Sequence, residues 1–407
     1  MVSSRFLRFA RFTGVLAFLI FFIVHFFTSK SRYEKTLALK KQILQETYNL
    51  NDDLPASPKT NIKIEYQQLP ETGYPDKINA AFITLARNSD LEKLAPTIRS
   101  VEDRFNAKFH YDWVFINDEE FTDEFKKQVR TLCSGSVIFE KIPEEYWSLP
   151  TDPSFDKRKA HNNRMKSREK MPYGGSASYR FMCRFFSGFY YRLPAISKYD
   201  YIWRVEPETT LHCDVNYDVF KYMSDNDKRY GFTISLYEFP LTIPSLWKTV
   251  QEFITLHPKF LNDNNLMDFI SFDEGLTFNL CHFWTNFEII DVNFLKSEAY
   301  TAFFDYLDKS YGFFYERWGD APVHSIAVAL FMDKSQVHYF NDIGYFHSPM
   351  HNCPIDDEIW TKNHCMCDQK FDSTFKSFSC TGRFYDVQQL EKPLGWEKFT
   401  FTPVNGQ

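Results

Sequence analysis

Two apolar runs with a helical stretch between them constrain the fold of this chain more than any other feature. The first run, Ile78–Leu85, is long enough for a buried strand, and the second is Asp112–Ile116. Leu91–Phe105, between them, has the spacing of apolar residues that is typical of a helix. A strand, a helix and a strand in this order predict the start of a βαβ unit with parallel strands. We therefore expect an α/β fold with a central sheet flanked by helices.

Further candidate strands follow, and some end in polar residues. Val137–Phe139 is a third candidate, and Tyr201–Val205 is another that ends directly before the carboxylate Glu206. Open α/β sheets build their ligand sites at the carboxyl ends of strands. Ser154–Lys170 is polar and is expected to form an exposed helix or loop. With no internal repeat and no second shift of composition, residues 76–407 are predicted to form one large domain.

The first thirty residues predict a membrane anchor. Arg5, Arg8 and Arg11 precede an apolar run from Phe12 to Phe27, which as a helix would rise about 24 Å. No small-residue cleavage site follows the run, so a retained signal anchor is favoured over a cleaved signal peptide. The prediction is a type II membrane protein with a cytosolic tip (1–11), an anchor helix (12–29), a proline-bearing stem (30–75) and a lumenal body. A span this short fits the thin membranes of the early secretory pathway.

All eight cysteines lie beyond the predicted anchor, which favours disulfides in an oxidising lumen. They are Cys133, Cys183, Cys213, Cys281, Cys353, Cys365, Cys367 and Cys380. Four of them lie between residues 353 and 380, close to His351 and His364, so zinc binding is the alternative. Disulfides that hold a loop-rich tail are the better interpretation, but sequence alone does not give their pairing.

Composition and motifs exclude several functions. The formal net charge is −6, so no overall basic character indicates nucleic-acid binding. The chain lacks a G-x-S-x-G elbow, an H-E-x-x-H pair, a Walker A loop and a G-x-G-x-x-G turn, which argues against hydrolases and P-loop enzymes.

Five segments instead combine carboxylates, histidines and aromatic residues. They are YGGSASYRFMCRF (173–185), RVEPE (204–208), CHFWTNFE (281–288), YERWGDAPVHS (315–325) and NDIGYFHS (341–348). Carboxylate and imidazole ligands beside aromatic rings suit a metal-assisted reaction on a sugar.

These segments, with TIPSLWKTVQEF at 242–253, resemble the fungal Golgi α-mannosyltransferases of glycosyltransferase family fifteen over about residues 78–380. The resemblance implies a GT-A-like fold and an enzyme that transfers mannose, most often in α-1,2 linkage, to O- and N-linked glycans. It further implies GDP-mannose as donor, Mn²⁺ as cofactor, mannosylated glycoproteins as acceptors and retention at the anomeric carbon.

The resemblance assigns the metal to Glu206 and His347. Glu206 belongs to the Glu-Pro-x sequence that stands where most GT-A enzymes have Asp-x-Asp, and Pro207 ends the strand so that the chain can turn away. The ordinary alternative for Glu206 is an ion pair with Arg204 or another neighbour, and for His347 a position in the core or on the surface.

The resemblance also assigns four residues around the donor. Glu288 matches the proposed nucleophile, although a retaining transferase can instead let the acceptor attack from the leaving-group face. Tyr179 matches an active-site tyrosine, Asp320 an aspartate that binds sugar hydroxyls, and Arg87 the start of the nucleotide site. The alternatives are packing for Tyr179, pairing with Arg317 for Asp320 and solvation for Arg87. Trp284 and Trp318 are candidate sugar platforms or core residues.

Two other functions stay open at this point. One is transfer of mannose phosphate, since the resembling family includes such members, and the other is a non-catalytic lumenal scaffold. Leu211-His212 before Cys213, where an aromatic pair is usual, and Leu295, where tryptophan is common, depart from the family pattern and bear on acceptor preference.

Overall fold

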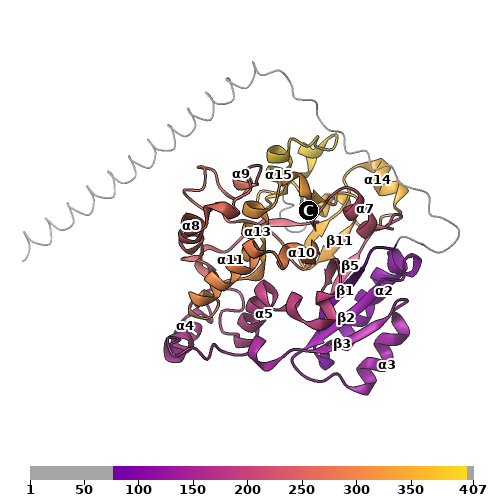
Figure 1. Cartoon of the computed structure of the whole chain (residues 1–407). Helices are drawn as coiled ribbons and strands as arrows, with labels where there is room; N and C mark the ends of the chain where they lie inside the picture. The colour runs from indigo at the N-terminus through magenta and orange to yellow at the C-terminus, as the bar shows by residue number, and fades with distance from the viewer. Residues whose placement is uncertain (1–76, 401–407) are drawn as a thin grey trace, which may run out of the picture. The chain divides into compact units, whose positions relative to one another are not determined.

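The computed structural model describes residues 77–400, which contain the predicted central sheet and its flanking helices (Figure 1). The strands are β1 (Ala80–Leu85), β2 (Asp112–Asn117), β3 (Val137–Lys141), β4 (Tyr201–Val205), β5 (Thr209–Leu211), β6 (Tyr230–Phe232), β7 (Ser235–Tyr237), β8 (Cys281–Phe283), β9 (Phe287–Asp291), β10 (Val337–Tyr339), β11 (Tyr345–His347) and β12 (Met350–Asn352). The helices are α2 (Leu91–Arg104), α3 (Asp123–Leu132), α4 (Lys157–Ser167), α5 (Ala177–Gly188), α6 (Pro194–Ser197), α7 (Val219–Asp225), α8 (Leu246–Leu256), α9 (Met267–Ile270), α10 (Val292–Leu295), α11 (Glu298–Lys309), α12 (Gly312–Tyr315), α13 (Asp320–Phe331), α14 (Asp357–Lys362) and α15 (Thr381–Gln388).

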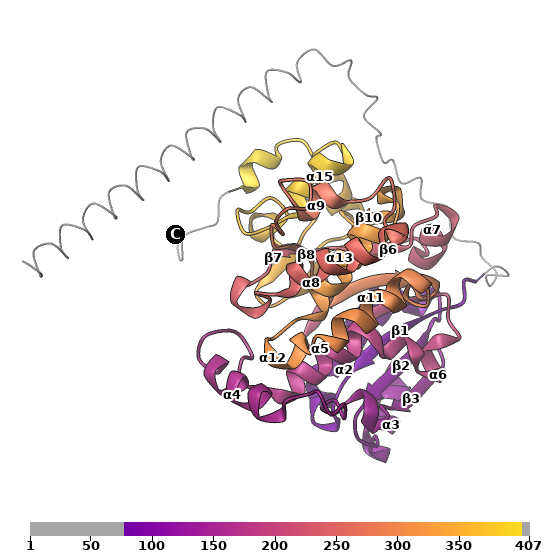
Figure 2. The same cartoon turned by 60° about the vertical axis from the view of Figure 1, so that its left-hand side comes forward.

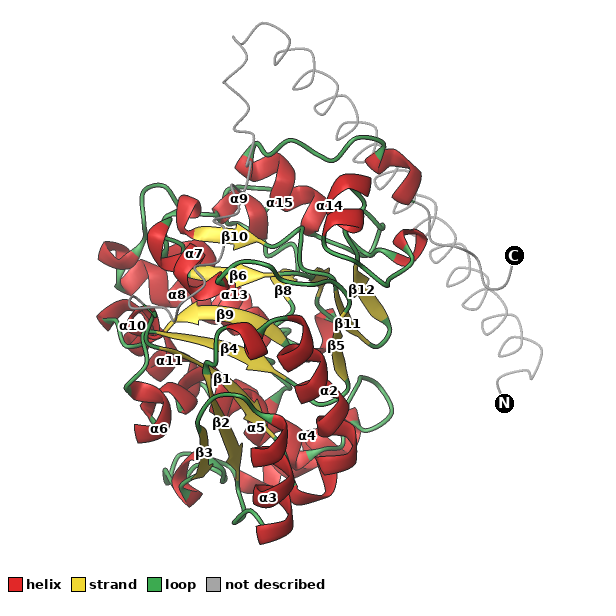
Figure 3. Cartoon of the chain, turned by 90° about the vertical axis from the view of Figure 1, so that its right-hand side faces the viewer, coloured by secondary structure: helices red, strands yellow, loops and turns green. Residues whose placement is uncertain are grey.

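The main sheet has seven strands in the order β10-β6-β9-β4-β1-β2-β3 (Figure 3). β1 pairs in parallel with both β2 and β4, which confirms the predicted βαβ start. β9 runs antiparallel to its neighbours β4 and β6, while β10 is parallel to β6. The sheet is therefore mixed, and the first residues of β9 lie at the same edge as the last residues of β4.

Side chains alternate across the first strand and feed two separate cores. Phe82 stacks on Trp113 at 4.6 Å between ring centroids and lies 5.3 Å from Trp203, all on one face. Apolar residues of α2, α3 and α7 complete that core. Ala81 and Ile83 point to the opposite face, where they join apolar residues of α5, α11 and α13. Burial on both faces explains why the sequence of this strand is a continuous apolar run rather than an alternating one.

Two small sheets stand beside the main one. β5 pairs antiparallel with β11, which in turn pairs with β12, and β7 pairs with β8. The register of β5 and β11 sets His347 opposite Thr209. Since β5 follows β4 after a short turn, this pairing brings a distant part of the chain to the end of β4.

The expectation of disulfides rather than zinc is confirmed. The pairs are Cys213–Cys365, Cys281–Cys380 and Cys353–Cys367, while Cys133 and Cys183 are free thiols. Two of the three bridges connect the C-terminal cysteines to the body of the domain rather than to one another. They hold the segment that follows β12 against β5 and β8.

The predicted cytosolic tip, anchor helix and stem lie outside the described residues. Between residues 77 and 400, no helix is both long and apolar enough to cross a membrane.

We expect the double substitution Cys281→Ser/Cys380→Ser to lower the free energy of unfolding by about 2–5 kcal/mol, because this bridge closes a long loop. The two cysteines are 99 positions apart in the sequence. Urea denaturation followed by tryptophan fluorescence measures the change, and Cys133→Ser is the matched control, since it removes a thiol without removing a bridge. An unchanged urea midpoint in the double variant would contradict a stabilising role for the bridge.

Candidate functional site

The candidate site lies at the carboxyl edge of the main sheet. β1 leads to Arg87 and β4 leads to Glu206, while Thr285 lies just before β9 at the same edge. Asp320 is the first residue of α13 and lies within hydrogen-bond distance of Thr285 and of Arg204 in β4. The topology therefore brings four separate stretches of sequence to one place, as expected for an open α/β sheet.

Arg204 is the central group of the site. Its Nη1 donates to Oδ2 of Asp320 at 2.6 Å, its Nη2 donates to Oε1 of Glu206, and its side chain is 4% exposed. The guanidinium also lies over the ring of Phe186, 3.6 Å from its centroid. Burial alone would lower the pKa of Arg204, but Glu206 and Asp320 raise it, so the guanidinium is permanently charged.

Asp320 is held ionised by its partners. Its Oδ2 accepts from Arg204 and, at 2.7 Å, from the hydroxyl of Thr285. Burial raises the pKa of this carboxyl, but Arg204 and the other partners outweigh it and the net shift is downward. The predicted alternative partner, Arg317, instead lies 3.5 Å from Glu238.

The two carboxylate oxygens of Glu206 contact different neighbours. Oε1 accepts from Arg204, and Oε2 lies 3.9 Å from Nε2 of His347. The Glu206 and His347 side chains are 29% and 26% exposed, so both can be reached from solvent. The residue after Pro207, Glu208, has a left-handed backbone conformation, with φ of 66°, and the chain then turns into β5. The structure thus brings together the two residues that the sequence assigned to a metal.

The donor chemistry at this pair fits a manganese ion. A carboxylate oxygen and an imidazole nitrogen are ligands that Mn²⁺ accepts. In residues 77–400, no group of three or more histidine, cysteine or acidic side chains is arranged to hold a metal. Glu206 and His347 are thus a pair whose chemistry suits such an ion, and no third histidine, cysteine or acidic side chain of the described residues joins them.

Glu288 is enclosed rather than open to the site. Its side chain is 1% exposed, and its Oε1 lies 2.7 Å from Nδ1 of His324, which is fully buried. Nε2 of His324 lies 2.8 Å from the carbonyl oxygen of Phe186, which can only accept, so this nitrogen carries a hydrogen. Burial lowers the pKa of His324, but Glu288 and Asp320 raise it to a net upward shift, which favours the charged form of the imidazole. Attack by Glu288 on a sugar would require this pair to separate, and its role as nucleophile stays a prediction.

Aromatic rings border the site on the α5 side. Tyr179 stacks on Tyr173 with centroids 4.4 Å apart, and the guanidinium of Arg317 lies 5.2 Å from the centroid of Tyr179. Burial raises the pKa of Tyr179 well above its ordinary value, so its hydroxyl stays protonated and can donate. Tyr173 is 65% exposed and forms the outer side of the stack.

The two candidate tryptophans, Trp284 and Trp318, differ in how deeply they are buried. Trp284 is partly buried, and its ring meets the ring of His347 edge-on at 4.9 Å, so it borders the predicted metal pair. Trp318 is fully buried, and its indole donates to Glu316 at 2.6 Å. Its interpretation as a sugar platform is therefore wrong, because core packing leaves no face for a ligand.

Arg87 is exposed directly after β1, and its backbone N–H donates to Asp90 at 2.9 Å. Sequence reasoning missed His324 altogether and named Arg204 only as an alternative partner. The available signal was position: Arg204 and Glu206 are two residues apart at a strand end and so share a face, and His324 is part of WGDAPVHS.

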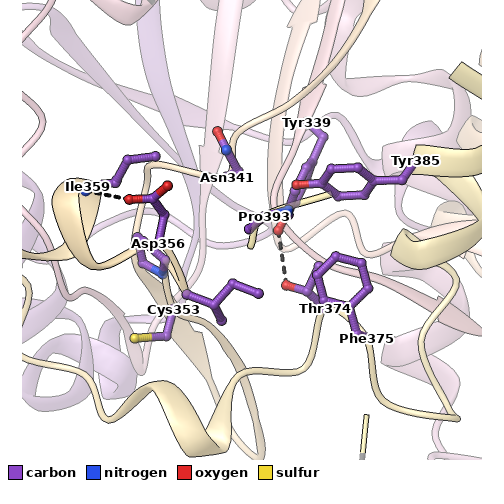
Figure 4. A pocket seen from close by; sticks show the side chains of 11 residues that line it. Tyr339, Asn341, Cys353, Asp356, Ile359, Thr374, Phe375, Tyr385 and Pro393 are labelled. Atoms are coloured by element: carbon purple, nitrogen blue, oxygen red, sulfur yellow. Dashed lines mark hydrogen bonds between the residues drawn. The ribbon is translucent and has the colours of Figure 1, made fainter. Parts of the chain in front are cut away.

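A separate pocket near the C-terminal segment contains none of the predicted site residues (Figure 4). Its volume is about 250 Å³, which includes space open to solvent, and it is lined by, among others, Tyr339, Asp356, Thr374 and Tyr385. The Tyr339 and Thr374 hydroxyls are 3.0 Å apart there.

Comparison with known proteins identifies the family. The sequence profile of the glycolipid 2-alpha-mannosyltransferase family matches residues 30–389. An α-1,2 mannosyltransferase of Saccharomyces cerevisiae, KTR1, is 55% identical over 332 residues, which cover 81% of this chain and 84% of that relative. Glycolipid 2-alpha-mannosyltransferase 1 of Candida albicans is 56% identical over 80% of this chain and 75% of its own length. The chain belongs to this family.

Solved structures of the family share the fold. Core-mannan synthase A of Aspergillus fumigatus, in a form with Mn and GDP, superposes with a TM-score of 0.71 at 35% identity, covering 83% of this chain and 93% of that one. The mannosyltransferase Ktr4p of S. cerevisiae in complex with GDP gives 0.68 at 40% identity, covering 77% and 82%. The chain is thus a glycosyltransferase of the glycolipid 2-alpha-mannosyltransferase family, which sets aside the non-catalytic scaffold.

We expect His324→Asn to cost the most stability at low pH, and the loss to shrink as pH rises. A histidine whose pKa is raised by folding stabilises the fold fully below its unfolded pKa of about 6.5. It loses that contribution as pH rises through the folded pKa. Urea unfolding of parent and variant from about pH 5.5 to about pH 9 measures the difference.

His338→Asn is the matched control with the opposite sign. Burial lowers the pKa of His338 to about 3, so the parent loses stability as pH falls below the unfolded value. The difference in the free energy of unfolding between the parent and His338→Asn should therefore become smaller at low pH. If the His324 difference has the same pH slope as the His338 difference, the assignment of an imidazolium to His324 is wrong.

Proposed function

We propose that this chain transfers mannose from GDP-mannose to a mannose-terminated O- or N-linked glycan, forming an α-1,2 linkage with retention at the anomeric carbon. The observation that carries the proposal is Glu206 at the end of β4, with His347 beside it and the Arg204–Asp320 pair behind it. The α-1,2 activity in the names of two relatives and the Mn and GDP in one solved structure support it. We assign the fold to the GT-A-like class, and the mixed sheet with the candidate site at its carboxyl edge supports this.

Glu206 and His347 would hold Mn²⁺, through the carboxylate oxygen not taken by Arg204 and an imidazole nitrogen. When bound, a divalent ion there neutralises the diphosphate and makes GDP a competent leaving group. Arg87, exposed after β1, is positioned for the nucleotide through a charge-assisted hydrogen bond.

Asp320, which is buried, and Tyr179, which is partly buried, orient the donor sugar. Asp320 is fixed by Arg204 and Thr285, so its carboxylate can accept from sugar hydroxyls without reorganising. Tyr179 keeps its proton and can donate to a sugar or phosphate oxygen. Trp284, next to His347, supplies an apolar edge for the sugar ring.

The burial of Glu288 favours the front-face route to retention. In that route the bond between the anomeric carbon and the diphosphate oxygen breaks, and the acceptor oxygen bonds to the same face. The acceptor proton passes to the departing diphosphate. No carboxylate has to reach the sugar, which agrees with Glu288 being paired to His324 at 2.7 Å. This pair then acts as a fixed dipole behind the site and not as a reactant.

We also propose that the protein is a single-pass type II membrane protein of the Golgi, with a tip at 1–11, an anchor at 12–29, a stem at 30–75 and the catalytic domain, 76–407, in the lumen. The support is the apolar run between basic residues, together with disulfides that need an oxidising compartment.

The direct test is incubation of the purified protein with GDP-mannose, Mn²⁺ and α-linked mannobiose. NMR of the product reports the linkage and the anomeric configuration. A phosphodiester in the product would instead identify transfer of mannose phosphate, and no product with any mannose acceptor would refute the proposed function.

We expect Glu206→Gln to lower the rate of mannose transfer and also to weaken the dependence of that rate on Mn²⁺. We expect the same two effects from His347→Ala. Loss of residues that only support metal ligands costs about 10–100-fold in affinity or activity, so loss of a ligand should cost at least that. The measurement is the initial rate across a Mn²⁺ titration.

Glu208→Gln is the matched control, because Glu208 is two residues away, 62% exposed and paired with Lys93. It should keep the parental Mn²⁺ curve. A parental curve in either ligand variant would show that the residue does not bind the metal.

We expect residues 70–407, placed behind a cleavable secretion signal, to be released from cells in soluble form and to keep the parental rate on a small soluble acceptor, because the site is built from residues beyond 86. Activity of culture medium and of washed membranes measures this. Loss of activity in the folded shortened protein would contradict the assignment of residues 1–69 to anchoring.

A further inference from the structure

Helix α4 and the residues after it form a basic surface on an otherwise acidic protein. Seven lysines and arginines lie between residues 157 and 170, while the whole chain has a formal net charge of −6. We call Lys157, Arg158, Lys159, Arg164, Lys166, Arg168 and Lys170 the α4 basic surface. Most of these side chains are exposed, and Ala160 is the buried residue of the helix.

None of these seven cations has an ion-pair partner among the described residues, whereas lysines and arginines of other helices often pair with carboxylates. Two of the seven have other contacts: Lys159 lies 4.1 Å from the ring centroid of Tyr315, and Arg164 donates to the carbonyl of Gly175 at 3.0 Å. The structure therefore carries a group of seven positive charges that form no ion pair within residues 77–400, although the exposed acids Asp156 and Glu169 lie beside and within the same stretch.

Hydrogen bonds hold the α4 basic surface to neighbouring segments of the candidate site. Asn163 donates to the carbonyl of Tyr315 at 2.9 Å, which fixes α4 to α12, directly before the segment that delivers Asp320 (Figure 2). On the other side, Arg164 holds Gly175, and the buried Arg180 donates to the carbonyl of Gly174 at 2.8 Å. The hydrogen bonds from Arg164 and Arg180 both hold the loop that carries Tyr173, whose ring stacks on Tyr179.

A ligand on α4 would therefore lie next to the exposed rim of the donor site, on the side of Tyr173. An acceptor has to reach the carboxyl edge of the sheet, where Glu206 and His347 are partly exposed, and Tyr173 is an exposed ring of the loop that α4 holds. The charge at the rim is complementary to an anion.

A membrane surface is the less suitable occupant. Helices that lie on anionic bilayers bury an apolar face among the lipids. Among the described residues, the large exposed apolar side chains include none within Lys157–Ser167, and the inner side of the helix is occupied by α12. Charge alone, without an apolar face, suits a hydrophilic anion.

We propose that the α4 basic surface binds an anionic group on the acceptor glycan, a phosphate monoester or diester on a sugar next to the one that receives mannose. This inference rests on the proposed function, because it assigns a substrate class to the same site. Exposed lysines and arginines bind the phosphate as point charges, and the acceptor hydroxyl is thereby held near Tyr173 and the donor. The enzyme thus prefers phosphorylated to neutral acceptors.

The experiment compares α-mannobiose with the same disaccharide carrying a phosphate monoester on its reducing-end sugar. The test variant is Lys157→Gln/Arg158→Gln/Lys166→Gln, and the control is Lys127→Gln/Lys198→Gln/Lys398→Gln, which removes the same charge from exposed positions elsewhere. Initial rates give KM and kcat for each acceptor at low and high salt.

For the parent and the control, we expect a KM about 5–30-fold lower for the phosphorylated acceptor at low salt, as for about three exposed charge interactions. The α4 variant should lose this preference and keep the parental KM and kcat for neutral mannobiose. Added salt should shrink the preference in the parent, because ions screen charges beyond about 10 Å at 0.1 M.

Equal KM values for the two acceptors in the parent, or an unchanged preference in the α4 variant, would overturn the inference. Binding of the parent to phosphatidylserine vesicles that α4 substitution abolishes, without an acceptor preference, would show a membrane site instead. If neither acceptor is mannosylated, the proposed function fails. Calorimetric titration of parent and α4 variant with the phosphorylated disaccharide then still decides whether the surface binds it.

Discussion

The site depends on one buried cation that joins two carboxylates from different parts of the chain. Arg204 lies in a central strand, Glu206 at the end of that strand, and Asp320 at the start of α13. Removing one partner of a buried pair typically costs about 3–5 kcal/mol, because the remaining charge is left without compensation. The arrangement therefore constrains both the sheet and the helix that approaches it, and it fixes the carboxylates before any ligand binds.

A second buried acid–base pair, Glu288 and His324, lies on the neighbouring strand and the same helix. Glu288 lies opposite Arg204 in the register of β4 and β9, and its partner His324 is one turn along α13 from Asp320. The two pairs together connect two neighbouring strands of the sheet to one face of a single helix. Each buried acid thus has a basic partner within hydrogen-bond distance, so the site keeps oriented polar groups in a region of low dielectric constant.

Sequence was informative where a pattern is local. Apolar runs predicted the strands near residues 80, 112, 137 and 201, because strands buried on both faces must be apolar along their length. The family resemblance assigned Glu206 to the metal, and its place at a strand end before Pro207 gave that assignment a local physical reason. The pairing of Glu288 with His324 and of Cys281 with Cys380 depends on residues far apart in sequence, so no spacing rule could give it. For Trp318 the sequence left a sugar platform and a core position open, because aromatic type does not reveal burial, and the structure places it in the core.

The way Glu206 divides its oxygens explains how one residue can serve both structure and ligand binding. Oε1 is taken by Arg204, so the carboxylate cannot rotate freely, and Oε2 is left facing His347 at 3.9 Å. His347 is placed there independently, by the pairing of β11 with β5 opposite Thr209. A shorter aspartate at the same backbone position would have to give up one of the two contacts, because the strand end is fixed by its neighbours in the sheet. The length of glutamate at this point thus allows one side chain to reach a buried arginine and a partly exposed imidazole at the same time.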